Sequence, residues 1–476
     1  MVNVAMHAAF DEILESLVAN SGVSRSVLAS VLVRAMVVAP SDVVRADIAK
    51  GTMLGRPKAL NPGAVSKAVA ALLDDGLLSE EPLQPDNRRA GRPVKPLHLG
   101  SSSWALIGIK IVHSLSKPTA LTGVVMTLGT DILGERDVDL PRDVTFETVA
   151  EHVAALVQTL TDELANDEAD PGTVRRRILA VGIDVASHVE NGRLIGATHM
   201  GLPVDEDYDL TTPLEELLGL PVVVDNDVNN LAVREMYRSK YTERDIALVA
   251  VFQDGVGGAL ILDGHVYRGG GGMAAEPGHQ TVQISLGRSP QSTHELRGLS
   301  GFSAPCHCER AGHIDCYAVP ARILAEVPEA TSFAEAAKMA GRGKSGKLTR
   351  AGWSFMIGGQ ALGQGIASII NVVNPSRVVL ILPSDLAPEN APAGAAAAEY
   401  LQAVEEAVTK YSFSSGAERA RAGSDMLTID VLDESEVRLA GATSAAVRAF
   451  DTFISHARGR DECSVDLGLA AVRSIA

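Results

Sequence analysis

The sequence predicts an α/β protein in which a small, mainly helical module precedes a larger region of alternating strands and helices. The first observation behind this prediction is length, because 476 residues exceed one ordinary domain. The second is that short aliphatic runs, the pattern of buried strands, recur from residue 106 onwards around a helical pattern at residues 149–164. We therefore expect two domains, at residues 1–100 and 101–476.

Composition places the chain among folded, water-soluble proteins. Hydrophobic residues make up 46% of the chain and charged residues 21%, with a net charge of −17. No run of about 18 uncharged apolar residues occurs, and the first residues lack the basic and apolar regions of a signal peptide. We expect a cytoplasmic protein that has no membrane partner and keeps its cysteines reduced.

The first hundred residues contain three helical patterns followed by a basic hairpin. Apolar residues recur at helical spacing within residues 24–37. Ser41-Asp42 and Asn61-Pro62 offer N-caps for helices at residues 42–48 and 62–73. Residues 88–95 are basic, contain glycine and proline, and are flanked by short strand-like pieces. This order predicts a winged helix-turn-helix.

The same module is the basic exception in an acidic chain. Residues 42–98 hold nine Lys and Arg against seven Asp and Glu. A basic run alone fits a helical cap with a solvated loop equally well, but three helices followed by a hairpin favour binding to a double-stranded DNA operator. In such modules the third helix enters the major groove and the wing neutralises phosphates. The candidate DNA contacts are Asn61, Ser66, Lys67, Arg88, Arg89, Arg92 and Lys95.

A cluster of soft metal ligands is the most specific motif in the chain. Three of the four cysteines, Cys306, Cys308 and Cys316, fall within eleven positions, together with His307 and His313. A tetrahedral zinc needs four such nitrogen or sulfur ligands, and Cys-x-Cys spacing suits a metal knuckle better than a disulfide. The alternative is a loop of reduced cysteines without a metal.

The larger region begins with a succession of strands. Three strands followed by a helix look like the opening of an actin-like nucleotide-binding lobe. The expected elements are strands at residues 106–112, 121–128 and 130–133, the helix at 149–164, and further strands at 179–186, 221–225, 246–252, 255–262 and 378–382.

From the winged helix to its last residues, the chain resembles the ROK family, which groups sugar-responsive transcriptional repressors with sugar kinases. The resemblance rests on Glu276-Pro277-Gly278-His279 after a run of glycines, on the cysteine cluster and on the pair Asn226-Asp227. It implies a ROK domain with two actin-like (ribonuclease H-like) lobes that enclose a small sugar.

The resemblance also implies which residues contact the sugar. Asn226 and Asp227 match the family's sugar-binding Asn and catalytic Asp, whereas an Asx turn that caps the next helix is the alternative reading of this pair. Glu276 and His279 match residues that bind sugar hydroxyls. His199 replaces a family Asn and is equally open to a structural role. The full set of expected contacts is His199, Asn226, Asp227, Glu276, His279 and Asp315.

For the metal, the family motif Cys-x-Cys-Gly-x-x-Gly-Cys-Leu-Glu aligns without gaps with residues 306–315. This alignment puts His313 in the place of the third cysteine and Asp315 in the place of a sugar-contacting Glu. It implies zinc bound by His279, Cys306, Cys308 and His313, because imidazole replaces a thiolate without loss of tetrahedral geometry. Cys316 competes for the last position.

Three departures from the kinases of this family argue against an enzyme. Residues Lys110–Ser114 replace an Asp-x-Gly-Gly-Thr loop, whose Asp serves the metal and whose glycines let backbone amides approach phosphate. Asp254 puts a carboxylate where phosphate would lie. Pro383–Asp385 replace a glycine pair that accommodates adenosine. We therefore expect no catalytic residues.

These observations predict a DNA-binding transcriptional regulator, more specifically a repressor, whose operator affinity is controlled by a small sugar or sugar derivative bound between the two lobes. We expect a homodimer or a dimer of dimers, in which the ligand changes the spacing of two recognition helices. The alternatives are an ATP-dependent sugar kinase with an added N-terminal domain, and a DNA-binding protein whose cleft no longer senses a ligand. The sequence names neither the sugar nor the operator.

Overall fold

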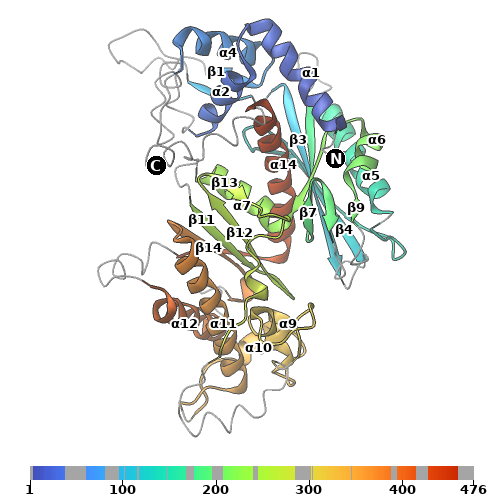
Figure 1. Ribbon diagram of the computed structural model, residues 1–476. Coiled ribbons are helices and arrows are strands. Elements are labelled where there is room, and N and C mark those ends of the chain that lie inside the picture. The colour runs from blue at the N-terminus through green and yellow to red at the C-terminus, as the bar shows by residue number, and fades with distance from the viewer. Residues whose placement is uncertain are drawn as a thin grey trace, which may run out of the picture. The chain divides into compact units, whose positions relative to one another are not determined.

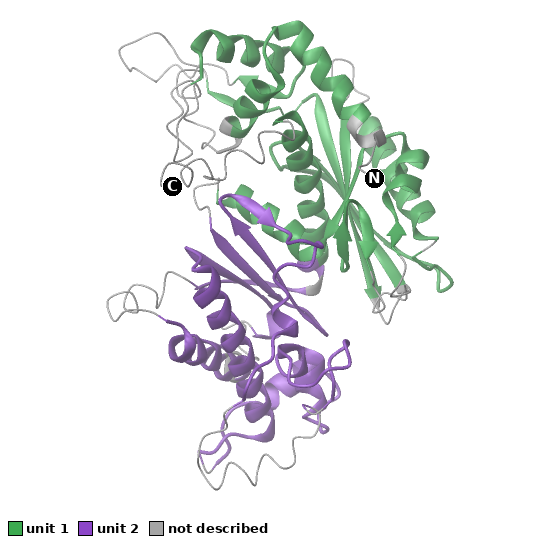
Figure 2. Cartoon of the chain, in the orientation of Figure 1, with its two compact units in different colours: residues 1–243, 438–476 green, residues 244–437 purple. Residues whose placement is uncertain are grey.

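The mixed α/β architecture expected from the sequence is confirmed. The chain forms two compact units (Figure 2), which are residues 1–243 with 438–476 (unit 1) and residues 244–437 (unit 2). Each unit is built on a five-stranded sheet, and the expected boundary near residue 100 falls inside unit 1. The computed structural model describes residues 4–37, 60–80, 96–100, 102–114, 117–146, 148–167, 176–195, 207–239, 245–284, 302, 304–344, 346–386, 394–413 and 427–458.

The N-terminal module of unit 1 contains two of the predicted helices and one that we did not expect. The unexpected helix is α1, although Phe10, Leu14 and Leu17 recur at helical spacing and are buried. The helix expected at residues 42–48 lies outside the described residues. The elements of the module are α1 (Val4–Ser21), α2 (Arg25–Val37), α4 (Pro62–Asp74) and the antiparallel strands β1 (Leu78–Glu80) and β2 (Leu97–Leu99) (Figure 1).

Helix α4 begins where the sequence places its cap. Asn61 Oδ1 accepts hydrogen bonds from the backbone N–H groups of Gly63 at 2.8 Å and Ala64 at 3.2 Å. Pro62 occupies the first turn, where its missing N–H has no intrahelical partner to lose. The apolar face of α4 is formed by Val65, Ala68, Val69, Ala71 and Leu72.

The main sheet of unit 1 has the strand order β10-β6-β3-β4-β5. Strands β10, β6 and β3 run parallel, whereas β3, β4 and β5 form an antiparallel meander. The strands are β3 (Trp104–Ser114), β4 (Lys117–Thr127), β5 (Ile132–Asp139), β6 (Arg177–Val185) and β10 (Val222–Asn226). The remaining elements are α5 (Val149–Asp167), α6 (Thr211–Leu218), α7 (Asp227–Arg238), α14 (Glu434–Arg458) and a small sheet of β7 (His188–Glu190), β8 (Arg193–Ile195) and β9 (Tyr208–Asp209).

Alternation along β3 and β6 divides their side chains between two faces of this sheet. Ile107, Ile109, Val181 and Ile183 belong to the apolar core that α5 covers. Gly108 and Gly182, which lie between them on the two strands, face α14. A Cβ atom at Gly108 or Gly182 would lie 1.9 Å from a backbone carbonyl oxygen of α14. The helix therefore rests directly on the sheet backbone, as strand glycines permit.

Polar contacts hold α14 at its middle and at its last turn. Arg448 Nε donates to Asp225 Oδ2 at 2.8 Å, which attaches the helix to β10. His456 Nε2 lies 2.9 Å from Asp11 Oδ1 of α1. The rings of Phe10 and Phe453 pack edge to face, with centroids 5.2 Å apart. Helix α14 thus connects the sheet of unit 1 with the N-terminal module.

A second link joins the end of α4 to the same sheet. The Asp75 carboxylate accepts hydrogen bonds from Trp104 Nε1 at 2.9 Å and from Arg177 at 3.1 Å. The Arg177 guanidinium also stacks on the Trp104 ring, 3.7 Å from its centroid. Because Asp75 is the C-cap residue of α4, this link fixes the C-terminal end of that helix.

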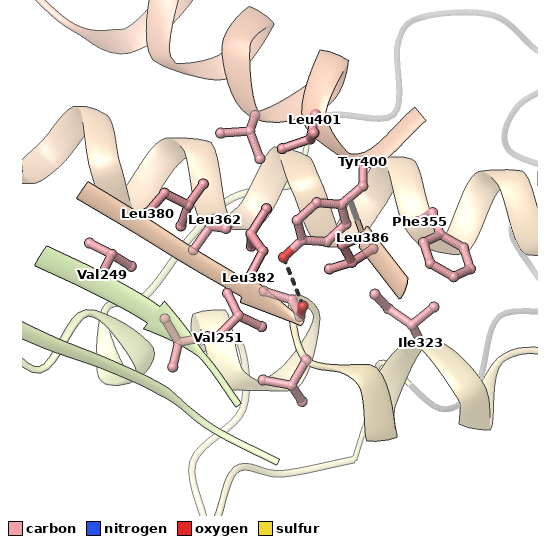
Figure 3. Packing of buried hydrophobic residues seen from close by; sticks show 14 of the residues in the cluster. Val249, Val251, Ile323, Phe355, Leu362, Leu380, Leu382, Leu386, Tyr400 and Leu401 are labelled. Carbon is pink, nitrogen blue, oxygen red and sulfur yellow. Dashed lines mark hydrogen bonds between the residues drawn. The ribbon is translucent and has the colours of Figure 1, made fainter. Parts of the chain in front are cut away.

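Unit 2 contains a sheet of order β13-β12-β11-β14-β15, in which β11, β14 and β15 are parallel. In its core, shown in Figure 3, the buried Tyr400 donates from its hydroxyl to Ala318 O at 2.9 Å. Its strands are β11 (Ile246–Val251), β12 (Val256–Leu262), β13 (His265–Tyr267), β14 (Arg377–Pro383) and β15 (Leu427–Leu432). Its helices are α9 (Pro320–Ala325), α10 (Phe333–Met339), α11 (Arg350–Val373), α12 (Gly394–Tyr411) and the 3₁₀ turns η2 (Pro277–His279), η5 (Ile314–Cys316) and η6 (Ser384–Leu386).

Among the described residues, helix α11 is long and apolar enough to cross a membrane by length and composition alone. However, most of this helix is buried inside the protein. Phe355, Leu362 and Ile366 of this helix pack into the core of unit 2. Helix α11 is therefore a core helix of this unit.

Candidate metal and ligand site

The structure brings the four predicted metal ligands together. Ligand atoms of His279, Cys306, Cys308 and His313 all lie within 4.8 Å of one another. Cys306 Sγ is 3.4 Å from His279 Nδ1, and Cys308 Sγ is 3.4 Å from His313 Nδ1. Ligand atoms around a tetrahedral zinc are about 3.3–3.8 Å apart. These two pairs have that spacing, and the four residues together offer two nitrogen and two sulfur donors.

Local backbone bonds shape this group. The N–H of Cys306 donates to Arg310 O at 2.9 Å, and the N–H of Glu309 donates to Cys306 O at 2.8 Å. Glu309 accordingly adopts a left-handed conformation with φ of 63°. The chain after His279 pairs with the chain at His313 through an antiparallel bridge at Thr281. This pairing holds the histidine from η2 against the cysteine turn.

The third cysteine of the cluster has a different environment. Cys316 is buried in η5, and its Sγ donates to Arg310 O at 3.8 Å. It is not one of the four residues whose ligand atoms converge.

Burial raises the pKa of the Cys306 thiol to about 12, so its thiolate needs a positive charge such as a metal ion beside it.

Asp315 lies beside the metal group as a buried, hydrogen-bonded residue. Its Oδ1 accepts the N–H of Val256 at 2.9 Å, and Cys306 Sγ donates to its Oδ2 at 3.6 Å. Burial raises the pKa of Asp315, whose exposed fraction is 7%. Glu276 is half-buried just before η2, and His279 is exposed.

In unit 1, Asn226 caps the helix that the sequence predicts after β10. Its Oδ1 accepts the N–H groups of Val228 at 3.0 Å and Asn229 at 3.2 Å. Its Nδ2 donates to Ser187 O at 3.1 Å. The Asx-turn interpretation of this residue therefore describes its hydrogen bonds.

Asp227 is buried at the first position of α7, beside a lysine. Its Oδ2 lies 4.0 Å from Lys110 Nζ, and that ammonium group lies 2.5 Å from Asp184 Oδ1. Strand β3 continues through Lys110 to Ser114, with a register shift against β4 between Val112 and His113, where a phosphate-binding loop would have to turn. The pairing of Lys110 with Asp184 is a feature that we did not predict.

The other two nucleotide segments are described in unit 2. Asp254 is exposed in the turn between β11 and β12. Pro383 ends β14, and the chain continues directly into η6. The segment at Pro383 lacks glycine, whereas Gly255, Gly257 and Gly258 follow Asp254. At Asp254 the departure from a phosphate-binding segment is therefore its carboxylate, which would repel phosphate oxygens.

Part of the candidate DNA surface is described. Asn61, Ser66 and Lys67 are exposed on α4, on the side opposite its apolar face. The remaining candidates Arg88, Arg89, Arg92 and Lys95, and the candidate sugar contact His199, lie outside the described residues.

Comparison with known proteins identifies one matching family and two kinds of relative, repressors and sugar kinases. The sequence model of the ROK family matches residues 118–382. The xylose repressor of Bacillus subtilis is 21% identical over 348 residues, which are 70% of this chain and 79% of the repressor. The glucokinase of Halalkalibacterium halodurans is 27% identical over 219 residues, which are 43% of this chain and 61% of the glucokinase.

Solved structures share the fold. A ROK family transcriptional regulator, described as a homologue of the E. coli Mlc protein, aligns over 91% of this chain and 99% of its own, with a TM-score of 0.64 and 18% identity. The ROK hexokinase of Thermus thermophilus aligns over 73% of this chain and 99% of its own, with a TM-score of 0.52 and 21% identity. The regulator therefore matches the fold over more of this chain than the hexokinase does.

Proposed function

The chain belongs to the ROK family, and we propose that it is a DNA-binding transcriptional regulator, a repressor whose operator affinity is controlled by a small sugar or sugar derivative. The observation that carries the proposal is the N-terminal module. It presents a capped helix, α4, with a polar exposed face, and it is bonded to α14 through α1 and to the sheet of unit 1 through the end of α4.

The DNA surface in this proposal is the exposed face of α4 and the basic hairpin. Ser66 and Lys67 would reach base edges or phosphates in the major groove, and Asn61 would present its backbone there while its side chain caps the helix. Arg88, Arg89, Arg92 and Lys95 would neutralise phosphates. The relatives named as xylose repressors support this assignment.

A phosphotransferase reaction is disfavoured by the chemistry of unit 1. A triphosphate needs backbone N–H groups and a metal-binding carboxylate. At the corresponding position β3 carries Lys110, whose ammonium group is bonded to Asp184. An Asp227 carboxylate beside that ammonium group can still accept a hydrogen bond from a sugar hydroxyl.

The candidate sugar contacts differ in how exposed they are. In unit 2, the half-buried Glu276 and the exposed His279 present polar groups at the surface, and vicinal hydroxyls suit a carboxylate acceptor. Asp315 is bonded to Val256 and Cys306, so we assign it the role of holding this segment. In unit 1 we assign the contact to Asp227 and the positioning of its helix to Asn226.

Zinc in this proposal is structural. His279, Cys306, Cys308 and His313 would fill a tetrahedral coordination sphere and leave no open position for water or substrate. The metal would stabilise the Cys306 thiolate and hold the His279 segment in place. A ROK regulator of this kind would act in the cytoplasm as a homodimer or a dimer of dimers on a two-part operator.

One experiment separates this proposal from a sugar kinase. Purified protein is incubated with Mg²⁺, ATP and a panel of hexoses, and sugar phosphate is measured alongside thermal stability. We expect stabilisation by at least one sugar without sugar phosphate formation, because a ligand that binds only the folded state raises its stability. Turnover at an ordinary enzymatic rate, about 1 s⁻¹ or more, would overturn the assignment as a regulator without kinase activity.

A further inference from the structure

Lys110 lies in a buried cluster of charges whose members come from β3, β6 and α7. Its Nζ is 2.5 Å from Asp184 Oδ1 and 4.0 Å from Asp227 Oδ2. Asn230, one turn further along α7, donates from Nδ2 to Asp184 Oδ2 at 3.3 Å. The exposed fractions are 8% for Lys110, 0% for Asp184 and 7% for Asp227, so water screens these charges weakly.

The fold fixes the position of the ammonium group. Lys110 and Asp184 are paired residues in the parallel ladder of β3 and β6. Helix α14 covers their side chains, and a Cβ atom at Gly441 would lie 2.5 Å from Lys110 Cδ. Glycine at this point of α14 therefore leaves room for the lysine stem. Two further charges between α14 and β10, Arg448 and Asp225, pair with each other at 2.8 Å.

The cluster holds one cation for two carboxylates. Burial opposes the charged form of Lys110, but attraction to Asp184 and Asp227 outweighs it and raises the pKa of Lys110 above its ordinary value. Burial, reinforced by the nearby Asp227 carboxylate, raises the pKa of Asp184. The lysine therefore stays charged beside both carboxylates.

We propose that Lys110 is a resident cation that positions the Asp227 carboxylate as an acceptor for a hydroxyl group, so that the effector is an uncharged polyhydroxyl compound bound without nucleotide or divalent metal. This inference rests on the proposed function. A negatively charged ligand group placed at Asp227 would meet its carboxylate, whereas Lys110 already faces two carboxylates. An uncharged hydroxyl donates to the same oxygen without that repulsion.

The first test needs no sugar. Lys110→Met removes the ammonium group and leaves Asp184 and Asp227 buried without it, so the pKa of Asp184 rises further. A carboxyl whose folded pKa is raised loses stability as the pH rises through that pKa. We expect Lys110→Met to melt at a lower temperature than the wild type near pH 8, and the difference to be smaller near pH 5. The lower pH, about 5, lies near the ordinary pKa of a carboxyl group, and the higher, about 8, lies in the range of raised carboxyl pKa values.

Two comparisons keep this test specific to the charge cluster. Lys110→Met/Asp184→Asn removes one carboxylate and should recover most of the deficit, and Mg²⁺ alone should stabilise Lys110→Met but not the wild type. Lys338→Met changes an exposed lysine on α10 and should match the wild type. A deficit that is equal at all pH values, or a double variant no more stable than Lys110→Met, overturns the role of Lys110. If Lys110→Met and the double variant both fail to fold, the proposed role of Lys110 is overturned as well.

The second test uses the sugar that stabilises the wild type and its phosphorylated form, each with EDTA present. We expect the uncharged sugar to bind equally well with and without the chelator and the phosphorylated form to bind at least about tenfold more weakly, a factor worth 1.4 kcal/mol. The dissociation constant in Lys110→Met should rise and become pH-dependent. Equal or tighter binding of the phosphorylated form overturns the ligand class. Absence of binding by any sugar overturns the proposed effector, while the first test still decides the role of Lys110.

Discussion

Replacing Arg448 should detach α14 from the sheet of unit 1. Its Nε donates to Asp225 Oδ2 at 2.8 Å, and a second nitrogen donates to Asp451 Oδ2 at 2.8 Å. The Asp225 side chain is 4% exposed, and that of Arg448 is 18% exposed. Removing one partner of a buried pair costs about 3–5 kcal/mol, because a charge remains buried without compensation. Asp225 Oδ1 still accepts the N–H of Asn226, so we expect Arg448→Met to lose about 3 kcal/mol.

Urea unfolding followed by tryptophan fluorescence measures this loss. The chain has two tryptophans, Trp104 in unit 1 and Trp353 in unit 2, and a Trp353→Phe background makes Trp104 the reporter of unit 1. With an m value of about 3 kcal/mol per molar urea, the midpoint should fall by about 1 M. The double variant Arg448→Met/Asp225→Asn should regain most of it. A loss below about 1 kcal/mol, or a double variant no better than the single one, would refute a buried pair that holds the helix.

Three further perturbations test other parts of the molecule. Elemental analysis should find one equivalent of zinc in the wild type, which His313→Ala should lose and Cys316→Ser should keep; the reverse result would mean that Cys316 is the ligand. Gly182→Ala places a Cβ 1.9 Å from the Ala445 carbonyl oxygen and should cost at least about 1–3 kcal/mol, whereas Gly134→Ala, which meets no atom within 4 Å, should leave the melting temperature nearly unchanged. Lys67→Ala should weaken DNA binding and reduce the slope of log affinity against log salt by about 1, and an unchanged slope would remove Lys67 from the phosphate contacts.

The features that could be predicted from the sequence are those that depend on residues close together in the chain. The cap at Asn61, the helix that follows Asn226 and the grouping of Cys306 with Cys308 depend on a few adjacent residues. Helix α1 carried the same local signal and could have been predicted from Phe10, Leu14 and Leu17. Residues 391–398 are rich in alanine and proline, which is typical of a connector, yet α12 begins at Gly394 because alanine is a strong helix former.

The remaining features depend on pairings between distant segments. Lys110 and Asp184 are 74 residues apart in the sequence, and only the parallel register of β3 and β6 makes them one ion pair. Likewise, Asp75 reveals its role only when Trp104 and Arg177 converge on it. Such contacts need strand order and register, which periodicity within one segment does not specify.

Selection of bound sequences from a random duplex DNA pool tests the central claim most directly. The full chain is used, the enriched duplex is titrated at fixed salt, and the titration is repeated with each sugar that stabilises the protein. We predict one enriched sequence, bound at least about 10³-fold more tightly than random DNA, and release of that DNA by a stabilising sugar. Equal binding to every duplex, combined with phosphorylation of the sugar, would contradict the account.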